Sequence, residues 1–326
     1  MLTGLERIRE LVREKPDRKL QTLMHLVNTK SLHTMHERQK TGRATGVDKV
    51  TKTEYEDKIK GNLTDLVRRM KTFSYRPQPV RRTYIPKEGS TKLRPLGIPA
   101  YEDKLVQGVM AEILNEIYEP KFCEFSYGYR EGKGCHSAIK DLQRKLWDDV
   151  NWVVDADIKG FFDNVDHDWM IRFLEHDIGD KNLLRYIRRF MKAGVMDRGE
   201  YSETDKGVPQ GGLISPIMAN VYLHYVLDLW FEKVVRVKCK GYSSMMRYAD
   251  DTVFCFQWED EAERFYESLK HRLGQFNLEV AEEKTKIIRF GRYAGKEAET
   301  FDFLGFTVIT GKKPQRKVLP QIPDKR

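Results

Sequence analysis

Apolar residues recur every three to four positions through the first third of the chain, the spacing that places them on one face of a helix. The stretch 5–40 predicts two helices separated by Pro16. A further helix is expected over 55–70, and another over 105–117 that ends before Pro120. The amino-terminal third is therefore predicted to be largely helical.

Short apolar runs interrupt this pattern and predict strands. They are expected at residues 80–85, 93–98, 151–158, 245–248, 252–256, 286–290 and 301–309. Helices are expected between them, at 168–176, 181–193, 215–229 and 262–276. From residue 151 onward the order is strand, helices, hairpin, helix, strand. This order is typical of a split βαβ sheet packed on helices, so the predicted fold class is α+β.

Composition narrows the class of protein. Of the 326 residues 40% are apolar, which is enough for a folded core. No run approaches the roughly 18 apolar residues of a membrane-spanning helix. The four cysteines form no C-x-x-C pair, so neither a disulfide scaffold nor a structural zinc site is expected. We therefore expect a soluble protein without a membrane partner, in a reducing compartment such as the cytoplasm.

The positive charge is concentrated near the amino terminus. The chain has 58 Lys and Arg against 49 Asp and Glu, a net charge of +9. Residues 1–100 carry 23 basic and 11 acidic side chains, whereas residues 101–300 are net acidic. This distribution favours a polyanion bound by one lobe and a carboxylate site in the other.

Aspartate residues lie at the ends of two of the predicted strands. Side chains alternate along a strand, so Asp155 and Asp157 share one face. Asp250 and Asp251 lie at the tip of the predicted hairpin. If the two strands are neighbours, Asp157 and Asp250 come within a few ångströms. Clustered carboxylates repel one another unless divalent cations bind, and oxygen ligands favour Mg²⁺.

Several segments, in a fixed order, resemble the sequence blocks of one family. Residues 248–251 read Tyr-Ala-Asp-Asp between two apolar strands, and Asp250 follows Asp157 by 93 residues. They are similar to the YxDD box of the reverse transcriptases. Residues 157–163 resemble the family's first metal motif, and residues 209–216 the motif that packs against the nascent base pair. Further matching blocks are residues 84–89, 93–99, 126–132, 283–286 and 303–306.

One branch of the family is favoured by the amino-terminal segments. Residues 22–27, 46–48 and 75–82 resemble the extension that group II intron reverse transcriptases, the intron maturases, carry before the fingers. Retron, diversity-generating and phage-defence reverse transcriptases share the core motifs and remain alternatives. A non-catalytic RNA-binding splicing factor is the alternative of a different class. Loss of a metal carboxylate would mark it, and all three carboxylates are present.

The resemblance implies a right-hand polymerase that copies intron RNA into DNA and binds intron RNA as a splicing maturase. The implied domains are a helical amino-terminal extension (1–70), fingers (71–150) and a palm with a split βαβ, ferredoxin-like sheet (151–311). Residues 312–326 would begin a linker to a thumb that is absent. Implied partners are group II intron RNA, a DNA primer or target, dNTPs and a second copy of the chain. The implied cofactor is a pair of Mg²⁺ ions, for which Mn²⁺ can substitute.

The resemblance also assigns roles to single residues. Asp157, Asp250 and Asp251 are the implied catalytic and metal residues, with the Ile158 carbonyl as an extra ligand, whereas Asp155 is expected to be structural. The implied nucleotide-binding residues are Lys87, Arg94, Phe162, Gln210 and Lys284. Among them Phe162 takes the position of the gate that excludes a 2′-hydroxyl, with Phe161 as its competitor. Lys87 and Arg94 are placed to neutralise a triphosphate.

RNA recognition is expected mainly through phosphates and 2′-hydroxyls. The candidate RNA-binding residues are Lys19, Lys30, Arg38, Lys40, Arg43, Arg68, Arg69, Arg81 and Arg82. Because Arg81 and Arg82 point to opposite faces of a strand, at most one of them is expected to face RNA.

Overall fold

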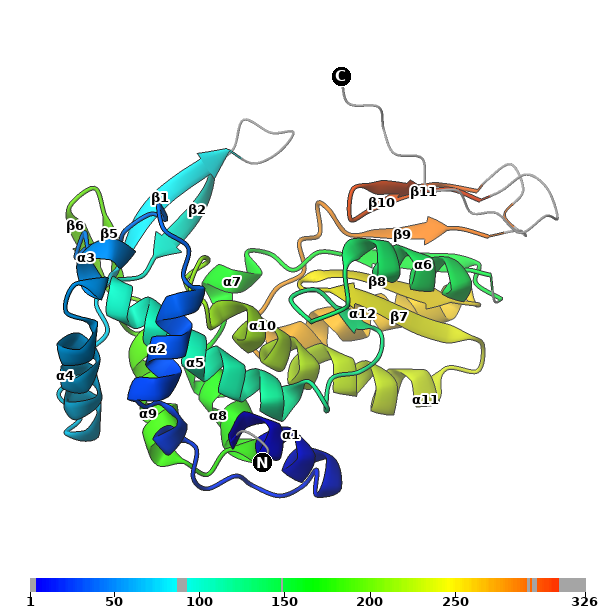
Figure 1. The fold of residues 1–326 in the computed structure, drawn as a ribbon. Coiled ribbons are helices and arrows are strands. Elements are labelled where there is room, and N and C mark those ends of the chain that lie inside the picture. Colours follow the sequence, from blue (N-terminus) through cyan, green and yellow to red (C-terminus); the bar gives the residue numbers. More distant parts are fainter. Residues whose placement is uncertain (1–3, 87–92, 148, 292–293, 295–297, 311–326) are drawn as a thin grey trace. The chain divides into compact units, whose positions relative to one another are not determined.

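The computed structural model describes residues 4–86, 93–147, 149–291, 294 and 298–310 (Figure 1). The chain folds into two compact units. Unit 1 comprises residues 1–121 and 162–221, and unit 2 comprises residues 122–161 and 222–326. Within the part of the chain that the structure describes, no helix has both the length and the apolar composition needed to cross a membrane.

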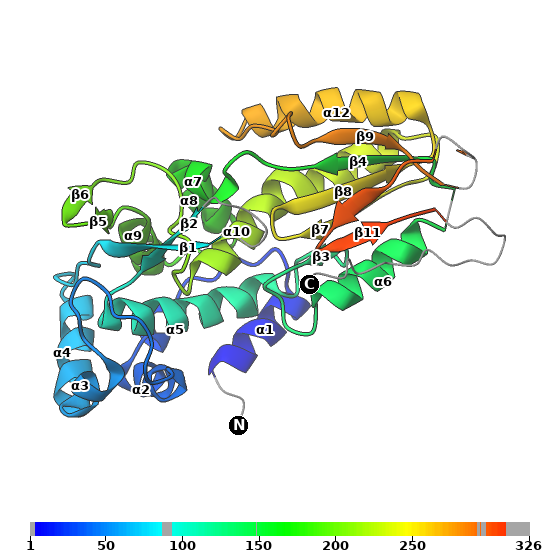
Figure 2. The same cartoon turned by 90° about the horizontal axis from the view of Figure 1, so that it is seen from above.

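Unit 1 is mainly helical. Its longest helix, α5 (Tyr101–Tyr118), is buried along most of its length, and α1 (Gly4–Glu14) and α2 (Thr29–Arg38) pack against it (Figure 2). The other helical segments in or bordering unit 1 are η1 (Met24–Leu26), α3 (Lys52–Glu56), α4 (Ile59–Lys71), α7 (Phe161–Asn164), α8 (His167–Asp177), α9 (Lys181–Met191) and α10 (Ser215–Leu223). Side chains of Asn28, Thr51, Asp166 and Asp180 cap helix N-termini and accept hydrogen bonds from the first turn.

The sheet of unit 1 contains the predicted hairpin. Strands β1 (Val80–Pro86) and β2 (Leu93–Ile98) pair antiparallel, as expected from the two apolar runs. Two short strands extend the sheet, β5 (Val195–Asp197) beside β1 and β6 (Glu200–Ser202) at the edge. The short runs that form β5 and β6 carry too few apolar residues to predict strands from the sequence.

Unit 2 is built on a five-stranded sheet with the order β3-β7-β8-β4-β9. The strands are β3 (Ser126–Tyr127), β4 (Trp152–Ala156), β7 (Ser243–Tyr248), β8 (Asp251–Phe256) and β9 (Lys286–Arg289). The four longer strands pair antiparallel with one another, with β4 between β8 and β9, and the short β3 pairs parallel with β7. This order confirms the predicted split βαβ sheet and the α+β class.

Each face of this sheet is covered. On one face Phe254 and Phe256 pack against Phe265 of α12 (Glu259–Gly274). On the other face Val153 and Val253 join a core with α6 (Cys135–Lys145) and the hairpin of β10 (Phe301–Phe303) and β11 (Phe306–Val308). Since side chains alternate along β4, Asp155 lies on the same face as Val153.

Four expected elements differ from the structure. The second helix expected within 5–40 begins only at Thr29, because Leu20 forms an isolated bridge with Ile178 and residues 24–26 form the short 3₁₀ helix η1. The predicted strand 301–309 is a tight hairpin, because Leu304 and Gly305 adopt φ values of 53° and 80° and reverse the chain. The predicted helix 55–70 is two helices, α3 and α4. The helix beginning at Ser215 runs past residue 229 as two π-helical segments, η2 (His224–Asp228) and η3 (Phe231–Val235), and ends in α11 (Arg236–Lys238).

The predicted domain ranges stay predictions. The two compact units divide the chain at residues 121, 161 and 221, whereas the lobes expected from the resemblance divide it at 70, 150 and 311. The expected linker 312–326 lies outside the described residues.

Candidate functional site

The register of unit 2 brings the predicted carboxylates to one edge of the sheet. Strands β4 and β8 are neighbours, and Ala156 pairs with Thr252. The next residues toward this edge are therefore Asp157 on one strand and Asp251 on the other. Asp250 lies beside them in the two-residue turn that joins β7 to β8, because Tyr248 pairs with Asp251. The expectation that these strands are neighbours is confirmed.

The charges at this edge act on one another. The pKa of Asp155 is raised to about 6, mainly by burial and in addition by the negative charges of Asp251 and Asp157. Within the described residues, no group of three His, Cys, Asp or Glu side chains is arranged as a metal-binding cluster. The edge therefore has the acidic oxygen donors suited to a hard divalent cation, without a preassembled coordination shell.

A lysine neutralises part of this charge. Lys284 Nζ donates a hydrogen bond to Asp157 Oδ2, and this bond raises the pKa of Lys284. The segment that carries Lys284 runs beside Asp157: Ala281 N donates to the Asp157 carbonyl at 2.8 Å, and Asp157 N donates to Thr285 Oγ1 at 3.3 Å. Ile158 is buried and bridges to Val280. The backbone thus holds Asp157 and Lys284 together.

The turn that contains Asp250 rests on β3. Ala249 adopts a left-handed φ of 55°, and its N–H donates to the Tyr127 carbonyl at 3.2 Å. Gly128 follows at φ 78°, and a Cβ there would lie 2.6 Å from Ala249 N. Only glycine permits this approach. The block 126–132, found from the sequence as a motif, therefore has a structural role beneath the turn.

A buried arginine holds the same turn from inside the unit. Arg247 is fully buried, and its guanidinium donates to the Ala249 carbonyl at 2.9 Å and to Ser126 Oγ at 2.7 Å. It also forms a two-pronged ion pair with Asp228 of η2, at 2.7 and 2.5 Å. Neither Arg247 nor Asp228 is predicted as a site residue from the sequence. The only signal was a single arginine inside an apolar strand.

The predicted nucleotide-binding residues fall in both units. Lys284 lies in unit 2, whereas Arg94, Phe162 and Gln210 lie in unit 1. Arg94 is exposed on β2 opposite Ile85. Lys87 lies outside the described residues.

The segment 207–211 packs against two other motifs of unit 1. Val208 N donates to the Phe162 carbonyl at 2.8 Å, and Gly97 N donates to the Gln210 carbonyl at 2.6 Å. Gly211 has φ 110°, and a Cβ there would lie 2.7 Å from the Gly97 carbonyl oxygen. Phe162 is half-buried, whereas Phe161 is buried. The half-buried ring of Phe162 is thus the more accessible of the two aromatic candidates.

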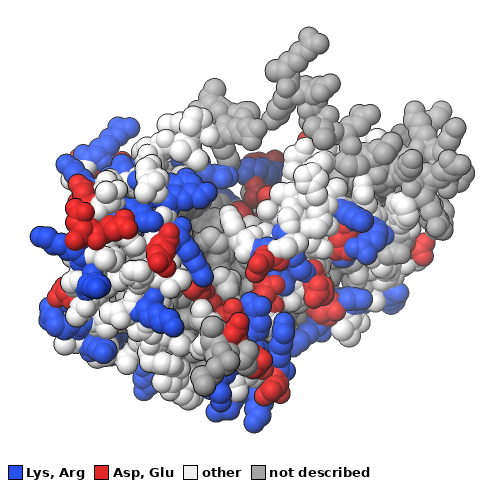
Figure 3. Space-filling view, in the orientation of Figure 1, with Lys and Arg blue, Asp and Glu red and all other residues white. Residues whose placement is uncertain are grey.

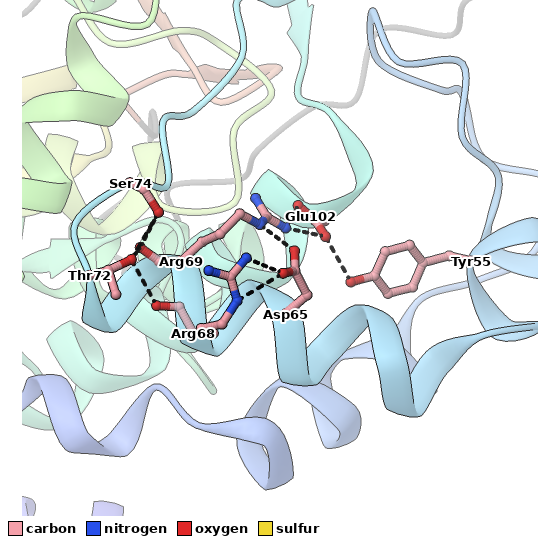
Figure 4. A network of polar contacts seen from close by, with 7 residues as sticks. All are labelled: Tyr55, Asp65, Arg68, Arg69, Thr72, Ser74 and Glu102. Carbon is pink, nitrogen blue, oxygen red and sulfur yellow. Dashed lines mark hydrogen bonds and ion pairs between the residues drawn. The ribbon is translucent and has the colours of Figure 1, made fainter.

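Several predicted RNA-binding arginines have partners within unit 1. Figure 4 shows Arg68 and Arg69 pointing to Asp65, and Arg69 reaching Glu102, which also accepts a hydrogen bond from Tyr55. Such pairs reduce the charge that a guanidinium presents to a polyanion.

The remaining candidates lie in varied surroundings. Arg38 pairs with Glu112, and Arg81 donates to the Thr45 carbonyl at 2.7 and 2.9 Å. Arg82 is half-buried on β1. Lys19, Lys30, Lys40 and Arg43 are exposed, as are the paired Arg38 and Arg68. On the face drawn in Figure 3, the basic side chains of unit 1 are spread over the surface with acidic side chains among them.

Comparisons with known proteins agree with these motifs. Residues 85–308 match the family model described as reverse transcriptase (RNA-dependent DNA polymerase). The group II intron-encoded protein LtrA of Lactococcus lactis subsp. cremoris is 35% identical over 249 residues, which cover 73% of this chain and 41% of that protein. Protein YkfC of Escherichia coli K12 is 31% identical over 314 residues, 86% of this chain and 80% of the relative. The chain thus spans about two fifths of the length of LtrA.

A solved structure shares the fold. The telomerase of Candida albicans, determined with a fragment of telomeric RNA, superposes with a TM-score of 0.54 at 14% sequence identity. The match covers 72% of this chain and 44% of the telomerase chain. At this identity the likeness concerns the fold alone.

Proposed function

The chain belongs to the reverse transcriptase family, in the group of intron-encoded reverse transcriptases and maturases, and we propose that it is the catalytic core of an RNA-directed DNA polymerase encoded by a group II intron. The observation that carries this proposal is the meeting of Asp157, Asp250 and Asp251 at one edge of the unit 2 sheet. The chemistry proposed is attack of a primer 3′-hydroxyl on the α-phosphate of a dNTP. A P–O bond forms to the primer, and pyrophosphate leaves.

The carboxylates are the proposed ligands of divalent metal ions, which the family uses in this reaction. Bound ions would activate the attacking hydroxyl and stabilise the leaving pyrophosphate. Two Mg²⁺ ions are the proposed cofactor, held by Asp157, Asp250 and Asp251 with the Ile158 carbonyl. The raised pKa of Asp155, caused in part by Asp251 and Asp157, supports this assignment because it reflects concentrated negative charge that a cation would relieve.

Other side chains are proposed to bind and orient the nucleotide. Lys284 holds a proton on Nζ beside Asp157, where it can pair with phosphate oxygens. Arg94 and Lys87 are proposed to neutralise the triphosphate, and Gln210 to pack near the template–primer base pair. Phe162 is proposed to exclude a 2′-hydroxyl and thereby to select dNTPs over NTPs.

The proposed RNA partner is the group II intron, as template and as splicing substrate. Similarity to an intron-encoded protein over 73% of this chain supports this partner. A DNA primer or target, dNTPs and a second copy of the chain are further proposed partners, and the bacterial cytoplasm is the proposed location.

Primer extension on an RNA template tests the catalytic proposal. The wild-type chain with dNTPs and Mg²⁺ is compared with Asp250→Ala and with Asp260→Ala, which removes an exposed carboxylate on α12. We expect Asp250→Ala to abolish extension and Asp260→Ala to retain it. Absence of extension by the wild-type chain, together with tight intron RNA binding, would identify a non-catalytic splicing factor and reject the proposal.

The same preparations test the intron partner. Each is titrated with a group II intron RNA and with an unrelated RNA of equal length at matched salt. Tighter binding of the intron RNA is expected. Equal affinities would favour the retron, diversity-generating or phage-defence branch.

A further inference from the structure

Three arginines gather around one short loop of unit 1. The loop follows α4 and contains Phe73, whose φ is 57°. Arg76 donates to the Phe73 carbonyl at 2.7 Å, and Arg189 of α9 donates to the same carbonyl at 3.1 Å. The guanidinium of Arg185, one turn earlier on α9, lies 4.3 Å from the centre of the Phe73 ring. Two separate segments thus bring three cations to one loop.

Among the described residues no ion pair involves Arg76, Arg185 or Arg189, in contrast to Arg69, which pairs with Asp65 and Glu102. Burial lowers the pKa of Arg189, and the charges of Arg76 and Arg185 lower it further. Gathering like charges is unfavourable, so a bound anion would stabilise this arrangement.

The exposed face of α9 extends the positive surface. Lys181, Arg185 and Lys192 are exposed, and Arg188 is partly exposed. Spacings of four, three and four residues place them on one face of the helix. The face spans about 16 Å along the helix axis. Asp168 of α8 pairs with Arg188 on this face at 2.7 Å.

Aromatic rings lie among these cations. Phe73 stacks on the buried Tyr186 with ring centres 6.5 Å apart, while Arg185 covers Phe73. On α8, Arg172 lies 4.9 Å from the ring centre of Trp169. Flat guanidinium and aromatic surfaces of this kind stack on unpaired bases, and guanidinium forks bind phosphates.

We propose that Arg76, Arg185 and Arg189, together with the exposed basic face of α9, form an RNA-binding surface that engages the phosphates of single-stranded RNA. We call it the α9 surface. Its residues differ from the amino-terminal candidates named from the sequence, although one of these, Arg69, borders the same loop through its carbonyl, and its assignment to RNA rests on the proposed function. Arg185 and Arg76 supply the accessible guanidinium groups, whereas Arg189, bonded to the Phe73 and Tyr75 carbonyls, holds the loop against α9.

RNA binding by paired variants tests the α9 surface. Arg76→Gln/Arg185→Gln is compared with a control of equal charge loss, Arg236→Gln/Arg264→Gln, in which each arginine belongs to an exposed ion pair of unit 2. The probe is a labelled 40-nucleotide RNA of mixed sequence, followed by fluorescence anisotropy at several salt concentrations. DNA of the same sequence is measured in parallel.

We expect the α9 double variant to bind RNA about tenfold more weakly than the control at 100 mM salt. Its slope of log affinity against log salt should fall by about 1.4, because two phosphate contacts are lost. The conservative variant Arg76→Lys/Arg185→Lys should restore most of the slope while keeping a weaker affinity, since it retains charge without the planar fork. Thermal unfolding of each variant identifies any loss of RNA affinity that is caused by misfolding.

Equal RNA losses in the α9 and control variants would overturn the proposal, as would an unchanged salt slope. An equal loss of DNA and RNA affinity would overturn the assignment to RNA in favour of a general polyanion surface. These readouts need no catalysis, so failure of primer extension would reject the proposed polymerase while leaving the RNA measurement decisive for this surface.

Discussion

Gly128 and Ala249 meet backbone to backbone where β3 ends beside the β7–β8 turn. Both adopt left-handed φ values, and the turn carries Asp250. A Cβ on Gly128 would lie 2.6 Å from the backbone nitrogen of Ala249, so the turn would have to move to relieve this clash. The position of Asp250, the proposed catalytic carboxylate, is therefore coupled to a residue that has no side chain.

Gly128→Ala is expected to reduce primer extension by at least tenfold and to destabilise the protein by more than the roughly 1–2 kcal/mol of a left-handed alanine. Gly132→Ala is the matched control: its φ is 73°, and an added Cβ meets no atom within 4 Å. We expect Gly132→Ala to lose only the stability that a left-handed alanine costs, and to retain primer extension. Steady-state extension rates and urea unfolding of both variants measure the difference, and equal effects would contradict the steric argument.

At this scale, the sequence predicted that the strands ending in Asp157 and Asp250 are neighbours, but not the residues that hold the turn in place. Asp157, Asp250 and Asp251 were recognisable because they interrupt apolar strands at their ends. Arg247 and Asp228 form a buried pair between a strand and a π-helical segment 19 residues away. Neither has a local pattern that reveals a partner, so only the folded chain could identify them.

At the scale of elements, Arg247 ties η2 to the β7–β8 hairpin and to β3. Arg247→Met leaves Asp228 buried without its guanidinium partner, with His224 Nδ1 3.9 Å away, and Asp228→Asn leaves the guanidinium without its counter-charge. Each is expected to destabilise the protein by about 3–5 kcal/mol. Urea unfolding at pH 7 measures the free energies.

The double variant Arg247→Met/Asp228→Asn should lose less unfolding free energy than the two single variants lose together, since the pair is then removed as a whole. Arg236→Ala, which breaks an exposed pair with Glu232, is the control and should change stability by about 0.5 kcal/mol or less. Strict additivity of the two single variants would show that the pair is not coupled.

The first turn of α5 contains a group that titrates near neutrality. Asp103 is buried, and burial raises its pKa to about 7, although Tyr75 Oη and Gln78 N donate hydrogen bonds to it. The folded state therefore holds a proton that the unfolded chain, with an ordinary pKa near 3.9, releases. Stability from this group is full below about pH 4 and is lost as the pH rises through about 7.

Asp103→Asn should reduce this loss. We expect the fall in unfolding free energy between pH 4 and pH 7 to shrink by about 3 kcal/mol relative to the wild type. Parallel urea unfolding curves at several pH values measure it, with the exposed Asp260→Asn as the reference variant. A pH dependence identical in wild type and Asp103→Asn would show that Asp103 ionises normally.

Regular elements were predictable where one pattern continued long enough. The β7–β8 hairpin was found because two apolar runs flank a polar turn. The β10–β11 hairpin was missed because Leu304 and Gly305 turn the chain inside an apolar run, where the pattern favours one strand. Likewise, the stripe beginning at Ile217 predicts a helix, yet it cannot distinguish the α-helical part from the π-helical η2 and η3, which differ only in hydrogen bonding.

At the scale of the molecule, the two units differ in charge. Unit 1 has 33 Lys and Arg against 26 Asp and Glu, and unit 2 has 25 against 23. The net charges of +7 and +2 show that the acidic middle of the sequence is shared between the units. The sequence correctly indicated a basic excess in the unit that contains the amino terminus. However, comparing residues 1–100 with residues 101–300 exaggerates the difference in net charge between the two folded units.

Mg²⁺ is expected to stabilise the folded protein by relieving repulsion among the unit 2 carboxylates. At a concentration tenfold above its dissociation constant the gain is about 1.4 kcal/mol, which corresponds to a rise in Tm of about 2–5 °C. Asp157→Asn and Asp250→Asn should lose this rise, whereas Asp260→Asn should keep it. Scanning calorimetry with Mg²⁺, with EDTA and with NaCl of equal ionic strength measures the effect, and a similar rise in all variants would indicate weak surface binding instead.

The place of β4 in its sheet has a consequence for synthesis of the chain. Both neighbours of β4 come later: Trp152 pairs with Phe256 and with Arg289. At about 5–20 residues per second, the ribosome needs roughly 5–20 s after completing β4 to deliver the first neighbour. Until then an apolar strand has two open edges, a state prone to association with other nascent chains. Asp155 within β4 and Asp157 directly after it place negative charge on this unpaired strand. The same carboxylates would therefore reduce aggregation of the nascent chain before it can bind a nucleotide.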